Sequence, residues 1–272
     1  MTDHFVYSVF TKPWKSLGLE ELAGHVKGLG FSAIELPIRD GFQVEPGNVA
    51  VKLPKASRVF AEHGVKIHSV AAEPTREMIA ACGGAGVPIL RIMVPIPENR
   101  DYLTHISDVQ RQWDGLVRLL DEHGVTLGVQ NHCRRFLTHA MHLYHAISQY
   151  DPAHVAAVWD AAHNALQGED VGLALDVIMP HLRMVNLKNA VWRRDNEDRP
   201  GEPARWRHQW VGGRDGLCDW RHVADELHRR NYRDVICLTA EYHPPINVET
   251  QIADDLAFAR QCFERHTAEA TR

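Results

Sequence analysis

The sequence predicts a (β/α)₈ barrel, and three observations support this expectation. Short apolar runs alternate with longer amphipathic runs along all 272 residues. Eight runs of each kind are present, and no linker or change of composition divides them. Eight strand-then-helix units match the usual size of such a barrel. We therefore expect one barrel domain spanning residues 1–272, with an active site at the carboxyl ends of the strands.

The expected strands are short runs rich in apolar and β-branched residues. They lie at His4–Phe10, Ser32–Pro37, Val65–Ala71, Pro88–Val94, Val125–Gln130, His154–Asp160, Leu182–Lys188 and Val235–Glu241. A doubly wound sheet is the alternative fold. That fold usually has a glycine-rich phosphate loop after its first strand, and no such loop follows Phe10.

Helices are expected between the strands, where apolar residues recur with a helical period. They lie at Leu19–Leu29, Leu53–His63, Thr75–Ala85, Tyr102–His123, Ala140–Tyr150, Val171–Met179, Trp220–Arg230 and Val248–His266. Four of the expected helices are followed by a glycine that can take the left-handed cap conformation before the next strand, namely Gly30, Gly64, Gly86 and Gly124. The segment Asn189–Leu217 is expected to be a long functional loop.

Composition and charge exclude several classes of protein. The net charge is −5, and no long run of either sign suggests binding to nucleic acid or to a membrane surface. No apolar stretch approaches the roughly 18 residues of a membrane span. The five cysteines are scattered, and no leader pattern opens the chain. We therefore expect a cytoplasmic protein that contacts neither nucleic acid nor membrane.

Polar residues end four consecutive strands. Side chains alternate along a strand, so Gln130, Asp160, Asn186 and Glu241 are expected to face inward at the carboxyl ends. The stretch from His154 to Asn164 places His163 three residues after Asp160, on the expected exit loop. Burying such a polar ring is costly unless it binds something. These strand ends therefore predict a site for a metal ion or a substrate.

The motifs FSAIELPIR, GVTLGVQNH, VWDAAHN, VNLKNA, VGGRDGLCDW and LTAEYH resemble those of the sugar phosphate isomerase/epimerase family of xylose-isomerase-like barrels. The resemblance implies one divalent metal held by residues that follow the fifth to eighth strands. Asp160 and Glu241 match this pattern. Gln130 replaces the family's glutamate, and Asn186 replaces its histidine. His163 matches a histidine that contacts substrate, and Lys188 matches a lysine of the seventh-strand motif.

The two amide residues weaken the expected metal site without abolishing it. Amide oxygens bind hard cations, so Gln130 and Asn186 favour manganese or magnesium over zinc. The ring keeps only two carboxylates, at Asp160 and Glu241, and it has lost its imidazole ligand. Lys188 alternatively pairs with these carboxylates and keeps the ring neutral.

The resemblance implies a small carbohydrate substrate and a sugar isomerase or epimerase that removes a proton next to a carbonyl group. Glu241 is the expected base, because Gln130 cannot exchange a proton. Its partner is His132, His163, Lys188 or a water. A lyase acting on a keto-sugar or keto-glycoside, and a non-catalytic sugar-binding barrel, are the alternatives. The resemblance also suggests a homo-oligomer, a dimer or tetramer. Further substrate contacts are expected from Glu35, His68, Trp192 and Arg194.

Overall fold

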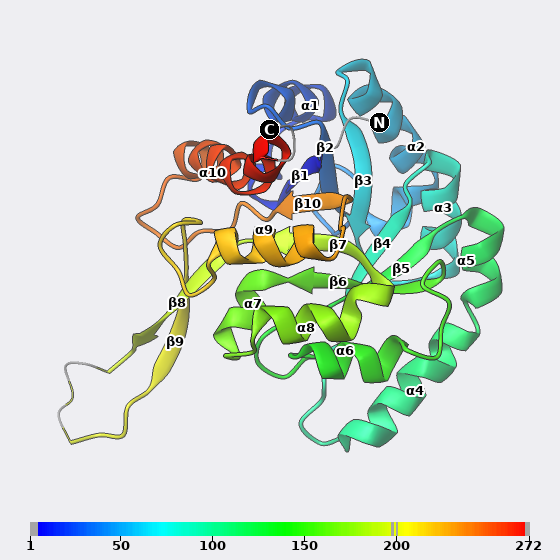
Figure 1. Cartoon of the computed structure of the whole chain (residues 1–272). Helices are drawn as coiled ribbons and strands as arrows, with labels where there is room; N and C mark the ends of the chain where they lie inside the picture. The colour runs from blue at the N-terminus through cyan, green and yellow to red at the C-terminus, as the bar shows by residue number, and fades with distance from the viewer. Residues whose placement is uncertain (1–4, 197–198, 200, 270–272) are drawn as a thin grey trace.

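The computed structural model describes residues 5–269 apart from 197, 198 and 200. A closed barrel of parallel strands lies at the centre, and helices surround it (Figure 1). Neighbouring strands follow the order β1-β10-β7-β6-β5-β4-β3-β2, and β2 pairs with β1 to close the ring. The predicted (β/α)₈ barrel is confirmed.

Every predicted strand is present, and each lies inside its predicted range. The barrel strands are β1 (Val6–Phe10), β2 (Ala33–Pro37), β3 (Lys66–Ala71), β4 (Ile89–Met93), β5 (Thr126–Gln130), β6 (Val155–Asp160), β7 (Leu182–Leu187) and β10 (Val235–Leu238). His4, the first residue of the predicted first strand, lies outside the described residues.

The helices are α1 (Leu19–Gly28), α2 (Val49–Glu62), α3 (Arg76–Ala85), α4 (Tyr102–Asp114), α5 (Val117–His123), α6 (Ala140–Ile147), α7 (Ala161–Leu166), α8 (Val171–Ile178), α9 (Trp220–Arg229) and α10 (Val248–Glu269). The predicted glycine caps are confirmed, since the φ angles of Gly30, Gly64, Gly86 and Gly124 are 91°, 69°, 68° and 60°.

Three predicted segments differ from the structure. The expected single helix Tyr102–His123 breaks after Asp114, where Gly115 ends α4 and Leu116 precedes α5. Glycine weakens helices because it loses the most backbone entropy on folding. His163 lies on the short helix α7 and not on a loop.

The segment Asn189–Leu217 is not an irregular loop. It contains an antiparallel hairpin of β8 (Asn189–Arg194) and β9 (Trp206–Val211), which projects from the barrel in Figure 1. Alternating tryptophan, valine and arginine residues favour strands, because bulky side chains pack well across a strand pair. The many charged residues in this segment favoured the prediction of a loop, because charged segments are typical of loops.

Two apolar layers stabilise the barrel. The larger layer lies between the strands and the helices, and includes Trp159, Trp220 and Phe263. A smaller cluster comes from the strands alone and fills the barrel, with members Phe10, Ala71, Ile89, Val158, Met184, Val235 and Cys237. Val158 and Met184 precede Asp160 and Asn186 by two residues, so the inward parity predicted for these strand ends is confirmed. Among the described residues, no helix is long and apolar enough to cross a membrane.

Candidate active site at the carboxyl ends of the strands

Asp160 ends β6 and is completely buried. One carboxylate oxygen caps α7 by accepting a hydrogen bond of 3.0 Å from the His163 amide. The other accepts one of 2.9 Å from the Gln130 side chain. The Asn131 side-chain amide binds the backbone of Asp160 twice. Its oxygen accepts a hydrogen bond of 2.6 Å from the Asp160 N–H group, and its nitrogen donates one of 3.1 Å to the Asp160 carbonyl oxygen. Asp160 is therefore fixed by β5 and by the start of α7, as a capping residue should be.

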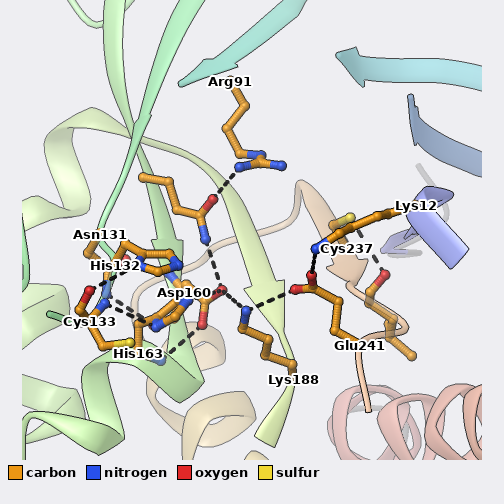
Figure 2. A network of polar contacts seen from close by, with 12 residues as sticks. Lys12, Arg91, Asn131, His132, Cys133, Asp160, His163, Lys188, Cys237 and Glu241 are labelled. Carbon is orange, nitrogen blue, oxygen red and sulfur yellow. Dashed lines mark hydrogen bonds and ion pairs between the residues drawn. The ribbon is translucent and has the colours of Figure 1, made fainter. Parts of the chain in front are cut away.

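Lys188 lies beside the two carboxylates of the predicted site. Its ammonium group is 3.1 Å from Glu241 and 3.9 Å from Asp160, and its side chain is only 5% exposed. The ammonium also lies 4.0 Å from the ring centre of Trp210 on β9. Lys12, which follows β1, binds the second oxygen of Glu241 at 2.5 Å. Figure 2 shows these ion pairs as one continuous network.

These lysines decide the protonation of Glu241. Burial acts to raise the pKa of this carboxyl, but Lys188 and Lys12 outweigh burial and lower the pKa to about 2. Burial raises the pKa of Asp160, and Lys188 acts against this shift. Glu241 is therefore ionised at neutral pH, and its charge is neutralised by two ammonium groups.

A second ion pair lies deeper in the barrel. Arg91 on β4 binds both oxygens of Glu35 on β2, at 2.7 and 2.8 Å, and neither side chain is more than 6% exposed. Arg91 also donates a hydrogen bond of 2.6 Å to the Gln130 carbonyl oxygen. Burial acts to lower the pKa of Arg91, but Glu35 outweighs it and the pKa is raised. This contact orients the Gln130 amide so that its nitrogen faces Asp160.

His132 and His163 adjoin each other, with ring centres 3.9 Å apart. Nδ1 of His132 lies 2.9 Å from the Cys133 carbonyl oxygen, so this nitrogen carries the proton and Nε2 is free to accept one. His163 has the opposite form, because its Nδ1 accepts the Cys133 amide at 3.1 Å. Burial lowers the pKa of His132 to about 4 and the pKa of His163 well below its ordinary value. Both rings are neutral at pH 7.

A cavity of about 120 Å³ lies at the carboxyl ends of the barrel strands, next to Lys188, Glu241 and His132. Its walls include four groups that can move a proton, Lys12, Lys188, His132 and Glu241, together with Gln130 and Asn186. Asp160 and His163 do not line the cavity and are fully buried behind it. His163 therefore lies where it supports His132 and Asp160, while the predicted contact between His163 and substrate remains a prediction.

The four predicted metal ligands come together, but their arrangement does not fit a divalent ion among them. Gln130 presents its NH₂ group to Asp160, and both oxygens of Glu241 bind ammonium groups. An ion between Asp160 and Glu241 would adjoin the Lys188 ammonium and be repelled by it. The carbonyl oxygen of Asn186 is buried without a partner among the described residues, so its lone pairs remain available.

A different group has the residue types of a metal site. His132, Cys133 and His163 have potential ligand atoms within 4.8 Å of one another. Burial raises the pKa of Cys133, which favours its thiol form, whereas a metal binds the thiolate. His163 already uses Nδ1 to accept a hydrogen bond. The group is close enough to hold a metal, but its protonation disfavours one.

The four residues expected to bind substrate lie in different places. Glu35 is inside the barrel, bound to Arg91. His68 is half-buried near the amino end of β3, and burial lowers its pKa. Trp192 and Arg194 lie on β8, where Trp192 is 39% exposed. None of the four lines the cavity. Strand parity does not define the depth of Glu35 and His68 along their strands, and Trp192 and Arg194 lie on a hairpin strand where the sequence predicted a loop.

The sequence interpretation missed several residues of the site. Lys12 follows β1 and Thr239 follows β10, and both line the cavity. Arg91 lies in the strand predicted at Pro88–Val94, but strand parity alone does not decide which way it faces. The structure pairs it in register with Gly128 on β5, two residues before Gln130, and places it in the cavity wall. No local pattern predicts a role for Trp210, because it reaches Lys188 only through the pairing of β8 and β9.

A closed parallel barrel with a polar cavity at the carboxyl ends of its strands is typical of TIM-barrel enzymes. The chain belongs to the xylose isomerase-like TIM barrel family, whose sequence model matches residues 24–262. No curated protein was found to match the chain.

Solved structures of similar fold include several sugar epimerases. The 3-keto-D-glucoside 4-epimerase from E. coli is 13% identical, with a TM-score of 0.73 over 95% of this chain and 100% of the other. An L-ribulose 3-epimerase is 14% identical, with a TM-score of 0.75 over 97% of each chain. A D-psicose 3-epimerase is 12% identical, with a TM-score of 0.73 over 94% of this chain and 99% of the other. At such identities the likeness establishes the fold and not the reaction.

Proposed function

We propose that this protein is an enzyme that isomerises or epimerises a keto-sugar by removing a proton next to the carbonyl group. The observation that carries the proposal is the placement of Glu241 and His132 around one cavity that also holds the Lys188 ammonium. The similar epimerase folds support the same class of substrate.

Glu241 is the proposed base. It is ionised, and a pKa of about 2 makes it a weak base while both lysines bind it. A keto-sugar whose carbonyl oxygen attracts the Lys188 ammonium removes one of these partners. The pKa of Glu241 then rises toward that of an ordinary carboxyl, so substrate binding itself activates the base.

Lys188 is the proposed electrophile. Removing the proton leaves negative charge on the substrate oxygen, and a buried ammonium is well suited to neutralise that charge. Asp160, 3.9 Å away, and the Trp210 ring hold the ammonium group at the base of the cavity. No step therefore requires a metal ion.

His132 is the proposed second proton carrier. Its Nε2 is free to accept a proton, and the Cys133 carbonyl fixes the orientation of the ring. Figure 2 shows His132 and Glu241 on opposite sides of Asp160 and Lys188. Epimerisation follows when Glu241 removes the proton on one face, and a proton that His132 Nε2 takes up from water is delivered to the same carbon on the opposite face. Glu241 then releases its proton to water, which restores both groups.

A lyase is the second candidate, because the site has a single carboxylate base in contact with ammonium acids. Glu241 would remove the proton, and Lys188 or Lys12 would protonate the departing oxygen group. The predictions of a cytoplasmic location and of a dimer or tetramer remain proposals.

The test is hydrogen exchange in D₂O with a panel of keto-sugars that includes 3-keto-D-glucosides. We expect deuterium to enter the carbon next to the carbonyl group, and Glu241→Gln to slow this exchange by about 100-fold or more. Glu77→Gln, which changes an exposed carboxylate on α3, is the matched control and retains the rate.

The products separate the candidates. An epimer or isomer supports the leading proposal, and an unsaturated product supports the lyase. Ligand binding without any exchange would instead identify a sugar-binding barrel and refute both catalytic proposals.

A further inference from the structure

A second cavity adjoins the proposed active site. Its volume is about 440 Å³, against about 120 Å³ for the polar cavity. The two share Arg39, Arg91 and Met93 in their walls, so they meet at these residues. Ligand pockets usually measure about 300–1,000 Å³, which the polar cavity alone does not reach. The volumes suggest a ligand that occupies both cavities.

The walls of the second cavity differ in chemistry from those of the first. They are mainly apolar, formed by the ends of β3 and β4 and by the loops that follow β2, β3, β4 and β5, with Ile38, Ala71, Ala72, Ile92, Pro95 and Phe136. The Phe136 ring packs against His132, with ring centres 4.6 Å apart. The apolar surface therefore begins directly beside a proposed proton carrier.

The second cavity has no concentration of positive charge for an anionic ligand, because its wall holds one carboxylate beside one arginine that no carboxylate binds among the described residues. Glu73 is exposed in its wall, and Arg91 is already bound by Glu35. Arg39 lies where the cavities meet, 6.0 Å from the Phe10 ring centre, and no ion pair holds it within the part of the chain that the structure describes. One arginine at the junction suits a hydroxyl or a ring oxygen. A phosphate dianion in the apolar space would face Glu73 instead.

We propose that the substrate is a keto-glycoside, whose sugar ring reacts in the polar cavity while an apolar aglycone binds in the second cavity. This inference rests on the proposed function and adds the substrate class. An aromatic or aliphatic aglycone would contact Ala72 and Phe136, and its linkage would pass Arg39. Burying such a group stabilises the complex in proportion to its apolar area.

The test is calorimetric binding of two probes, phenyl and methyl 3-keto-β-D-glucopyranoside, to the full chain. We expect the phenyl glycoside to bind at least about tenfold more tightly. Ala72→Phe fills the second cavity and should abolish this preference without weakening the methyl glycoside. Ala153→Phe places the same side chain on an exposed position before β6 and should retain the preference.

Phe136→Ala provides a second variant if Ala72→Phe does not fold, and it should reduce the preference by removing one wall. Equal binding of both probes to the unchanged protein would overturn the inference. Tighter binding of glucose 6-phosphate than of either probe would overturn it as well. If neither glycoside binds, the inference fails, while exchange in D₂O with the other keto-sugars of the panel still tests the proposed function separately.

Discussion

At the scale of single residues, the site is defined by how charge is balanced. Three cations, Lys12, Arg91 and Lys188, face three carboxylates, Glu35, Asp160 and Glu241. The family resemblance implies that a divalent metal supplies positive charge at this position, whereas in this protein side chains supply it. The replacement of glutamate by Gln130 and of histidine by Asn186 is consistent with this balance, because both changes remove groups that a metal prefers.

The sequence predicted these residues better than it predicted their contacts. Strand parity places Gln130, Asp160 and Asn186 correctly, because side chains alternate along a strand of known ends. Parity does not show that Lys188 turns toward Asp160 and Glu241. That contact depends on the distance between β7 and the segment after β10, which only the closed barrel determines.

Restoring the family residues should restore metal binding. The double variant Gln130→Glu and Asn186→His adds one carboxylate and one imidazole next to Asp160. We expect it to bind Mn²⁺ at least about tenfold more tightly than the unchanged chain, with lower native activity. Mn²⁺ titration followed by electron paramagnetic resonance measures the affinity. A variant with higher native activity would contradict the role given to Lys188.

At the scale of secondary-structure elements, the hairpin is the least predictable part of the site. Its first strand, β8, carries exposed Trp192, whereas Trp210 on β9 lies over Lys188 and near His163. The sequence indicated that the segment is functional but not that it forms strands, since its charges resemble those of a loop. Long-range pairing between β8 and β9 resolves this ambiguity only in the folded chain.

The contact between α8 and α9 has a stability that depends on pH. Hydrogen bonds from Arg229 and Arg230 lower the pKa of Glu226 to about 2, and Arg230 also binds Asp176 and the Gly172 carbonyl on α8. A depressed pKa contributes stability above the unfolded value of about 4.3, and this contribution is lost as the pH falls through about 2.

Glu226→Gln should therefore destabilise the protein by about 1 kcal/mol at pH 7, and this difference should narrow as the pH falls from about 5 toward 3. Urea denaturation at a series of pH values measures the effect. Glu62→Gln, on the exposed end of α2, is the control. If the difference in the free energy of unfolding between Glu226→Gln and the unchanged protein stays constant with pH, the ionised Glu226 carboxylate does not stabilise the contact between α8 and α9.

Packing inside the barrel gives a second test at this scale. A Cβ atom added to Gly128 on β5 would lie 2.7 Å from Val158 and 3.1 Å from Ile89, whereas one added to Gly84 on α3 meets nothing within 4 Å. Gly128→Ala should cost about 1–3 kcal/mol, because it overpacks a filled interior. Gly84→Ala should be neutral or slightly stabilising. Denaturation of both variants measures this, and equal effects would show that the barrel interior is not tightly packed.

At the scale of the whole molecule, the fold was the most predictable feature. Eight alternating units of regular length specify a closed barrel, because each strand-helix pair buries its apolar face against its neighbours. The ends of the helices followed from glycine residues that can take positive φ angles. The reaction is less predictable, since one barrel fold hosts many chemistries and function depends on the site.

We propose that proton abstraction by Glu241 proceeds with the Lys188 ammonium in the role that a metal ion would otherwise have. The most direct measurement is the rate of deuterium incorporation from D₂O into a 3-keto-D-glucoside, with protein freed of metal by a chelator and the same protein supplied with Mn²⁺. We predict equal exchange rates in both samples, and a loss of about 100-fold or more in Lys188→Met with either treatment. Exchange that appears only after Mn²⁺ is added, and that survives Lys188→Met, would contradict the claim.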